Sequence, residues 1–432
     1  MTQVDHRIDI TTGRVSADQV AENFSDLHAP LNAHEALVAA DRCYFCHDAP
    51  CITACPTSID IPLFIRQIAT GTPEAAARTI FDQNILGGLC ARACPTETLC
   101  EQACVRETAE GEPVKIGALQ RYATDTLMAQ QGHPYHRAAE TGKKIAVIGA
   151  GPAGLACAHR LAMHGHSVTI FDTRDKAGGL NEFGIAAYKV PDNFAQQELD
   201  WLLAIGGIQI ETNQKLGREI ELAAIQAAHD AVFLGIGLSG VHELSLSGNH
   251  PEMIDAVDWI AQMRQSQDKT DVPVGRNVVV IGGGMTAVDA AIQARLLGAE
   301  TVTIAYRRGQ EAMSASLFEQ NLATSKGVHI LFNATPKSLS DNAVTFQRTG
   351  TDEEIKLPAD QVMRAIGQAF EDAPYGIVIE RGRIKTVGQG RTSVEGIWAG
   401  GDCTADGENL TVTAVAQGRD AAEDIHATLK GN

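Results

Sequence analysis

The chain has 432 residues, 44% of them hydrophobic and 20% charged, which is typical of a folded protein with two or three domains. No apolar run approaches the roughly 18 residues that a membrane-spanning helix needs, and the polar N-terminus shows no secretory signal. A formal net charge of −18 disfavours binding to nucleic-acid phosphates or to an anionic membrane surface, so we expect a cytoplasmic protein.

Residues 1–30 are polar and lack a clear period, and we expect an irregular arm there. From about 31 to 122 the apolar pattern predicts helices and no strands. Eight of the ten cysteines fall in this part, in two blocks that each contain a Cys-Pro step: Cys43, Cys46, Cys51 and Cys55, then Cys90, Cys94, Cys100 and Cys104. Such short spacings, with Cys-Pro closing a block, are typical of ferredoxins. We therefore predict a helical domain, residues 1–135, that carries two iron–sulfur clusters.

Three other interpretations of the cysteines compete with this one. Disulfides need an oxidising compartment, which the polar N-terminus does not indicate. Structural zinc is the stronger rival, because eight cysteines could form two sites of four thiolates, although zinc sites usually separate two Cys pairs by a longer loop. Burial as small apolar residues does not account for the clustering.

A polar segment, 131–144, reads as a linker, and a dinucleotide-binding unit follows it. The strand IAVIG runs into a glycine turn with Gly149, Gly151 and Gly154, then a helix and the strand SVTIFD, which ends at Asp172. The glycines permit the turn, the approach of a pyrophosphate and close helix packing, while the helix N-terminus binds the anion. A carboxylate at Asp172 suits ribose hydroxyls.

The same unit returns 133 residues later, with Gly282, Gly284 and Thr286 in its turn. Where the first copy has Asp172, this copy has Tyr306 followed by Arg307 and Arg308. Guanidinium groups bind a 2′-phosphate bidentately, so this copy favours NADPH over NADH, unless the two arginines are only a solvent-facing pair.

The last segment reads EGIWAGGD and is followed by an amphipathic helix that begins near Thr411. It holds no complete nucleotide unit, and we expect it to return to the first one. The predicted fold is an all-α iron–sulfur domain followed by two α/β Rossmann-like domains, the second inserted in the first, with segments 144–272, 273–366 and 367–432.

Two such fingerprints and a closing GGD–helix resemble flavoprotein reductases with two dinucleotide folds. With the eight-cysteine domain in front, residues 41–426 resemble the glutamate synthase small-subunit family, which includes the flavin subunit of bacterial dihydropyrimidine dehydrogenase. The resemblance implies FAD in the first nucleotide domain and NAD(P)H in the inserted one.

The resemblance also assigns the metal ligands. It gives Cys43, Cys46, Cys51 and Cys104 to one 4Fe–4S cluster, and Cys55, Cys94, Cys100 and Gln120 to the other. Glutamate synthase small subunits resemble one another in having Glu at this last position, whereas dihydropyrimidine dehydrogenases have Gln, as in the IGALQRY run here. Gln120 could instead be an ordinary polar helix residue, in which case Cys90 is the alternative fourth ligand.

The resemblance places flavin contacts at Gly149, Gly151, Gly154, Asp172, Gly179, Leu180, Lys189, Asp402 and Thr411. It places pyridine-nucleotide contacts at Gly282, Gly284, Thr286, Arg307, Arg308 and Gly367. One departure is Ala186, where the family's flavin loop has proline, and another is Ala-Met-Ser where some relatives carry a further basic residue after the arginine pair.

These parts predict an oxidoreductase subunit in which a two-electron carrier feeds one-electron clusters. No nucleophile–base pair stands out, and we predict no catalytic side chain. We expect the electrons to leave for an FMN-containing dihydropyrimidine dehydrogenase subunit that reduces uracil or thymine. The alternatives are a small subunit of NADPH-dependent glutamate synthase and, in another class, a zinc-stabilised nucleotide-binding interaction protein.

Overall fold

The computed structural model describes residues 9–130, 132–370, 374 and 376–431, so Gln131 of the predicted linker lies outside the described residues. The chain forms two compact units. The first unit comprises segments 1–27, 183–191 and 240–369, and the second unit comprises segments 28–182, 192–239 and 370–432. In the described part of the chain, no helix is long and apolar enough to cross a membrane.

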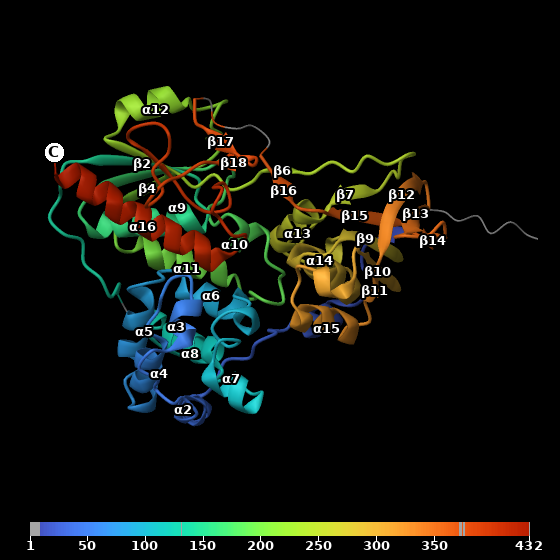
Figure 1. The fold of residues 1–432 in the computed structure, drawn as a ribbon, viewed down its shortest axis with the longest axis horizontal. Coiled ribbons are helices and arrows are strands. Elements are labelled where there is room, and N and C mark those ends of the chain that lie inside the picture. The colour runs from blue at the N-terminus through green and yellow to red at the C-terminus, as the bar shows by residue number, and fades with distance from the viewer. Residues whose placement is uncertain (1–8, 131, 371–373, 375, 432) are drawn as a thin grey trace, which may run out of the picture. The chain divides into compact units, whose positions relative to one another are not determined.

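The second unit begins with the cysteine-bearing part, which is helical as predicted (Figure 1). Its helices are α2 (Ala33–Asp41), α3 (Pro50–Ala54), α4 (Ile61–Ala69), α5 (Pro73–Phe81), α6 (Gly87–Ala93), α7 (Val105–Glu110) and α8 (Ile116–Met128). Asn32 and Glu35 form a capping box at the start of α2, which satisfies amide N–H groups that the helix leaves unpaired. The apolar face of α4 buries Phe64, Ile65 and Ile68 in the core.

A five-stranded parallel sheet forms the rest of the second unit, in the order β19-β5-β2-β3-β4. Its strands are β2 (Lys144–Ile148), β3 (Ser167–Phe171), β4 (Ile208–Glu211), β5 (Ala231–Leu234) and β19 (Ile397–Ala399). Its helices are α9 (Pro152–Met163), α10 (Leu180–Phe183), α11 (Phe194–Leu203), α12 (Leu222–Ala228) and α16 (Thr411–Lys430), and β17 (Ile379–Glu380) pairs with β18 (Arg383–Ile384). Residues 144–148 and 231–234 are almost all buried, as parallel strands covered on both faces require.

Helix α16 packs along α9 (Figure 1). A Cβ added at Gly418 of α16 would stand 2.1 Å from the carbonyl oxygen of Ala153 in α9, so the two backbones touch there. At the other end of this contact lie three histidines. The rings of His164 and His426 stack with centroids 3.9 Å apart, and Nε2 of His166 lies 2.9 Å from Nδ1 of His426.

We expect these histidines to make the protein less stable in mild acid. Burial, together with the charges of His426 and His164, lowers the pKa of His166 to about 4. Because the unfolded chain binds this proton more readily, stability is complete above the ordinary histidine pKa of about 6.5 and is lost as the pH falls towards 4. The loss from His166 is about 2 kcal/mol at pH 5. Thermal unfolding at pH 7.5 and pH 5 should show a smaller pH effect in His166→Asn than in the unchanged protein, and equal effects would contradict this.

The first unit holds a second five-stranded parallel sheet, in the order β11-β10-β9-β15-β7. The strands are β7 (Met253–Asp255), β9 (Asn277–Gly282), β10 (Thr301–Ala305), β11 (His329–Leu331) and β15 (Gln361–Ala365), and the helices are α13 (Ala256–Gln265), α14 (Met285–Leu296) and α15 (Leu317–Ser325). An antiparallel sheet of β12 (Ala334–Ser340), β13 (Ala343–Arg348) and β14 (Glu354–Pro358) lies in the same unit, where β6 (Gly240–Val241) also pairs with β16 (Gln368–Ala369).

Residues 9–27 differ from the irregular arm that the sequence predicts. Strand β1 (Ile10–Thr11) pairs with β8 (Val274–Gly275), and helix α1 (Ala17–Asn23) follows it in the first unit. Val20 and Phe24 are buried in the core that contains β9 and α14. Two apolar side chains and a two-residue strand are too few to give a readable period, which is why the pattern looked irregular.

Candidate functional site

The eight clustered cysteines lie at the ends of short helices and in the loops between them. Cys43 and Cys46 follow α2, Cys51 lies in α3 and Cys55 ends it, Cys90 lies in α6 and Cys94 ends it, Cys100 lies in a loop, and Cys104 begins α7. All ten cysteines of the chain are described, and none forms a disulfide. The disulfide interpretation therefore has no support in the structure.

Electrostatic interactions link Cys43 with Cys46 and Cys104, and Cys51 with Cys104 and Cys43, while Cys51 also acts on Cys100. Burial raises the pKa of the Cys43 thiol, and the charges of Cys46 and Cys104 raise it further. Burial also raises the pKa of Cys51 to about 12, with added contributions from Cys104 and Cys43. These are the four cysteines that the family resemblance assigns to one cluster.

Cys55, Cys90, Cys94 and Cys100 form the other group. Burial raises the pKa of Cys94 well above its usual range, and so do the charges of Cys90, Cys100 and Cys55. Gln120 lies in α8 with its side chain buried, and its Nε2 donates to the carbonyl oxygen of Gly87 in α6 at 2.7 Å. Both candidates for the fourth ligand are thus at helix α6: Cys90 belongs to it, and Gln120 of α8 contacts it.

The donor set fits iron–sulfur clusters. Cysteine binds a metal as the thiolate, so these buried thiols would lose their protons only where a metal supplies the compensating positive charge. Among the residues described, no three His, Cys, Asp or Glu side chains form a group that could hold a single metal ion. A four-iron cluster instead takes each thiolate at a different iron, which suits two groups of cysteines on separate helix ends.

The first glycine turn connects β2 to α9 in the second unit. Gly149 has φ +102°, and a Cβ there would stand 2.3 Å from the carbonyl oxygen of Gly235, so this position requires glycine. Gly151 precedes α9, and no side chain caps the helix there, which leaves the N-terminal amide groups of α9 for an anion. The oxygens of Asp172 accept the N–H groups of Ala150 and Arg174, at 2.6 and 2.8 Å.

Segments distant in sequence meet at this turn. A Cβ added at Gly179 would stand 2.6 Å from the Cα of Gly151, and a Cβ at Gly401 would stand 3.1 Å from the Cβ of Ala153. Leu180 follows Gly179 and opens α10, and Asp402 follows Gly401; burial raises the pKa of Asp402 and the charge of Arg383 lowers it. At the start of α16, Thr411 Oγ1 donates to the side chain of Asn181 at 2.9 Å. The structure therefore gathers the predicted flavin contacts of the second unit around one helix N-terminus.

Lys189 belongs to the first unit, which contains segment 183–191. Its buried Nζ lies 2.7 Å from a carboxylate oxygen of Asp289 and 2.7 Å from one of Glu319. Both carboxylates hold the ammonium charge, and their attraction raises the pKa of Lys189 despite its burial. In this arrangement the side chain anchors segment 183–191 within the first unit.

The second glycine turn connects β9 to α14 in the first unit. Gly282 has φ +151°, and a Cβ there would stand 2.1 Å from the carbonyl oxygen of Ala365. Gly284 begins α14 without a side-chain cap, and Thr286 lies in the first turn of that helix. Gly367, with φ +101°, follows the neighbouring strand β15. This geometry repeats the anion-binding arrangement of the first turn.

The two arginines follow β10, the strand next to β9. Both are exposed, and Nε of Arg308 donates to the hydroxyl of Tyr306 at 2.9 Å. The ring of Tyr306 fills the space beside Gly283, where a Cβ would stand 2.4 Å from it. Tyr306 thereby replaces an acid at the strand end and holds one guanidinium next to the glycine turn.

Two residues that touch these sites were missed by the sequence analysis. Asn181 accepts a hydrogen bond from Thr411. Its position in the GGLN run, two residues after Gly179, is the sequence feature that could have indicated it. Glu198 of α11 is 1% exposed and bonds backbone amides of α6. The sequence feature that could have indicated Glu198 is its spacing of four residues from the buried Phe194 and Leu202, which places an acid on an otherwise apolar helix face.

Two protein families match the chain. Residues 20–132 match the family described as dihydropyrimidine dehydrogenase domain II, 4Fe-4S cluster. Residues 143–418 match the pyridine nucleotide-disulphide oxidoreductase family. Together they cover the cysteine-bearing helices and both glycine turns.

Individual proteins are similar over nearly the whole length. The NAD-dependent dihydropyrimidine dehydrogenase subunit PreT of Escherichia coli K12 is 36% identical over 92% of this chain and 95% of its own. The glutamate synthase [NADPH] small chain of the same organism is 32% identical over 93% of both. Among solved structures, Mycobacterium tuberculosis FprA in complex with NADPH matches 67% of this chain and 85% of its own, with a TM-score of 0.56 and 16% identity, which shows a shared fold.

Proposed function

The chain belongs to the pyridine nucleotide-disulphide oxidoreductase family and, within it, to the group of glutamate synthase small subunits and dihydropyrimidine dehydrogenase flavin subunits, and from this premise we propose that it supplies electrons to a pyrimidine-reducing partner. It is an oxidoreductase subunit with a 4Fe–4S domain in front of a Rossmann-like nucleotide-binding fold. One observation carries the electron-transfer part of the proposal: the eight clustered cysteines share a compact unit with a dinucleotide turn.

The cofactors carry the electrons, since FAD accepts a hydride from NAD(P)H and each 4Fe–4S cluster takes one electron at a time when bound. The chain binds and orients them. We propose that the first cluster is held by Cys43, Cys46, Cys51 and Cys104 and the second by Cys55, Cys94, Cys100 and Gln120. The α9 N-terminus would bind the FAD pyrophosphate, and Asp172, whose oxygens retain unused lone pairs, would accept the ribose hydroxyls.

We also propose that the nucleotide domain is inserted in the flavin domain. The supporting observation is the strand order of the second unit, in which β19 of the C-terminal segment pairs in parallel with β5. Residues 240–369, which separate these two strands in the sequence, belong to the other unit. The flavin contacts at Asp402 and Thr411 depend on this return of the chain.

NADPH is the proposed electron donor, and exposed Arg307 and Arg308 are the proposed 2′-phosphate ligands. The names of the relatives do not decide between the two coenzymes, because PreT is named NAD-dependent and the glutamate synthase small chain is named with NADPH. A charge-assisted hydrogen bond contributes about 1.5–3 kcal/mol, so replacing both arginines by Ala should raise the KM for NADPH by about 10- to 100-fold and leave that for NADH within about twofold. Steady-state kinetics with both coenzymes would check this, and Arg348→Ala is a control on a half-exposed arginine of the same unit, which pairs with Glu353. Equal changes for both coenzymes would reduce the pair to surface charge.

The proposed partner is an FMN-containing subunit that reduces uracil or thymine to the 5,6-dihydro form. The support is the relative named as a dihydropyrimidine dehydrogenase subunit, together with Gln120, which is the residue of that branch. The decisive experiment is co-purification with the protein encoded next to it, followed by uracil-dependent and glutamine-dependent oxidation of NAD(P)H. Uracil-dependent oxidation with a partner of about 45 kDa supports the proposal.

Two other outcomes would point elsewhere. Glutamate formation with a far larger partner would assign the chain to the glutamate synthases, to which it is 32% identical. Stoichiometric zinc in place of about eight irons per chain would instead indicate a zinc-stabilised interaction protein.

A further inference from the structure

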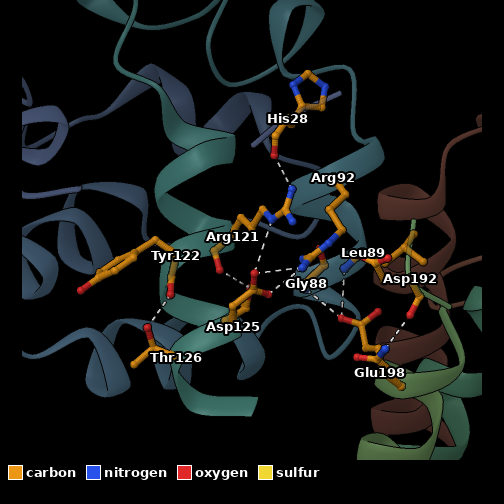
Figure 2. A network of polar contacts seen from close by, with 12 residues as sticks. His28, Gly88, Leu89, Arg92, Arg121, Tyr122, Asp125, Thr126, Asp192 and Glu198 are labelled. Carbon is orange, nitrogen blue, oxygen red and sulfur yellow. Dashed lines mark hydrogen bonds and ion pairs between the residues drawn. The ribbon is translucent and has the colours of Figure 1, made fainter. Parts of the chain in front are cut away.

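Glu198 is a buried carboxyl group at the first turn of helix α6, and burial raises its pKa to about 8 (Figure 2). It comes from α11, and its Oε1 accepts the N–H groups of Gly88 at 2.8 Å and Leu89 at 3.1 Å. Its Oε2 is also buried and has no hydrogen-bond partner among the described residues. A Cβ added at Gly88 would stand 2.8 Å from Oε1, so the absence of a side chain at Gly88 allows this close approach. Burying a carboxyl group away from water costs free energy unless hydrogen bonds to the surrounding structure compensate for it.

A single peptide group links this carboxylate to Gln120. The N–H of Gly88 donates to Glu198, and the C=O of the same peptide group, which belongs to Gly87, accepts from Nε2 of Gln120 at 2.7 Å. The hydrogen bonds therefore run in one direction, from the amide of Gln120 through the backbone to the carboxylate. Hydrogen bonds in such a chain polarise and strengthen one another.

Charged side chains around these hydrogen bonds hold together the two helices that the bonds connect, α6 and α8. Nη2 of Arg92 in α6 donates to both carboxylate oxygens of Asp125 in α8, each at 2.9 Å, and Nη1 donates to the carbonyl of Gly88 at 2.9 Å. The Arg92 guanidinium also lies 3.4 Å from the ring centroid of Phe194 in α11. Helices α6, α8 and α11 are thus joined at one place (Figure 2).

We propose that Glu198 is a positioning residue for the second cluster and acts through Gln120. By holding the peptide group of Gly87 and Gly88, it keeps Nε2 of Gln120 engaged as a donor. The amide oxygen of Gln120 is then the atom left to bind iron. This inference rests on the proposed function and concerns a residue that touches neither the iron nor the flavin.

The test uses the full chain with its flavin and clusters in place, and reads the two cluster signals by electron paramagnetic resonance. Glu198→Ala breaks the chain of hydrogen bonds and should alter the second signal, with iron released to a chelator from that cluster about tenfold faster. Glu198→Gln keeps an acceptor oxygen and should restore both properties to within about twofold. The signal of the first cluster is the internal control.

A double substitution shows whether the effect passes through Gln120. In a Gln120→Ala background, Glu198→Ala should cause no further change in the second signal, since coupled residues are not additive. An unchanged second signal in Glu198→Ala, or an equal change in both backgrounds, would overturn the inference. If Glu198→Ala fails to assemble its clusters, Glu198→Asp, which withdraws the carboxylate by one methylene, is compared in the same two backgrounds and judged by the same outcomes. Absence of both signals from the unchanged protein would instead refute the proposed function.

Discussion

Replacing Cys94 by Ser should remove one iron–sulfur cluster and stop the export of electrons. The charges of the other three clustered cysteines of its group, Cys90, Cys100 and Cys55, all act on Cys94. A serine hydroxyl does not ionise at neutral pH and cannot replace the thiolate. Iron should fall from about eight to about four per chain. Electron transfer to the partner subunit should fall by at least about 100-fold, because the path through that cluster is interrupted.

Reduction of a dye that takes electrons directly from the flavin should persist in this variant, because the glycine turns are untouched. Cys403→Ser is the matched control. Cys403 is fully buried and belongs to neither group, and its Sγ donates to the carbonyl oxygen of Gly400 at 3.2 Å, a bond that a hydroxyl can make. The control should retain its iron and its electron transfer. A Cys94→Ser variant with all of its iron would show that the second group of cysteines does not hold a cluster.

Features of this fold that depend on neighbouring residues could be predicted from the sequence. Both glycine turns followed from local spacing, since the backbone at Gly149 and Gly282 leaves no room for a Cβ. The helices of the cysteine-bearing part also followed from local patterns, such as the apolar face of α4. The assignment of the cysteines to two clusters came from the family resemblance and stays a prediction, since the electrostatic interactions also link Cys51 to Cys100.

Features that depend on distant contacts could not be predicted. Lys189 pairs with Asp289 and Glu319, which lie 100 or more positions after it in the sequence, and no local pattern indicates these contacts. The burial of Val20 and Phe24 depends on a core built by residues after 255. Glu198 resembles a surface acid until α6 packs against it. In each case the partner, and not the residue itself, decides the environment.

Gly151→Ala should weaken flavin binding by at least about tenfold while leaving the fold intact. A Cβ at this position would have only the Cα of Gly179 within 4 Å, at 3.9 Å, so the protein itself has room for it. The reason for glycine here is then the ligand, because the second glycine of such a turn lets the backbone approach the pyrophosphate. Gly154→Ala should instead destabilise the fold itself. Its Cβ would stand 1.9 Å from the carbonyl oxygen of Gly149 and must displace backbone.

The pair separates binding from folding. Flavin affinity of the two variants would be measured by fluorescence titration, and the stability of their flavin-free forms by thermal unfolding. We expect Gly151→Ala to unfold within about 2 °C of the unchanged chain and Gly154→Ala to unfold many degrees lower, because overpacking of this kind costs about 1–3 kcal/mol or more. If Gly151→Ala bound flavin normally, the pyrophosphate would not lie over the N-terminus of α9. The assignment of this turn to FAD would then fail, whatever the cysteines hold.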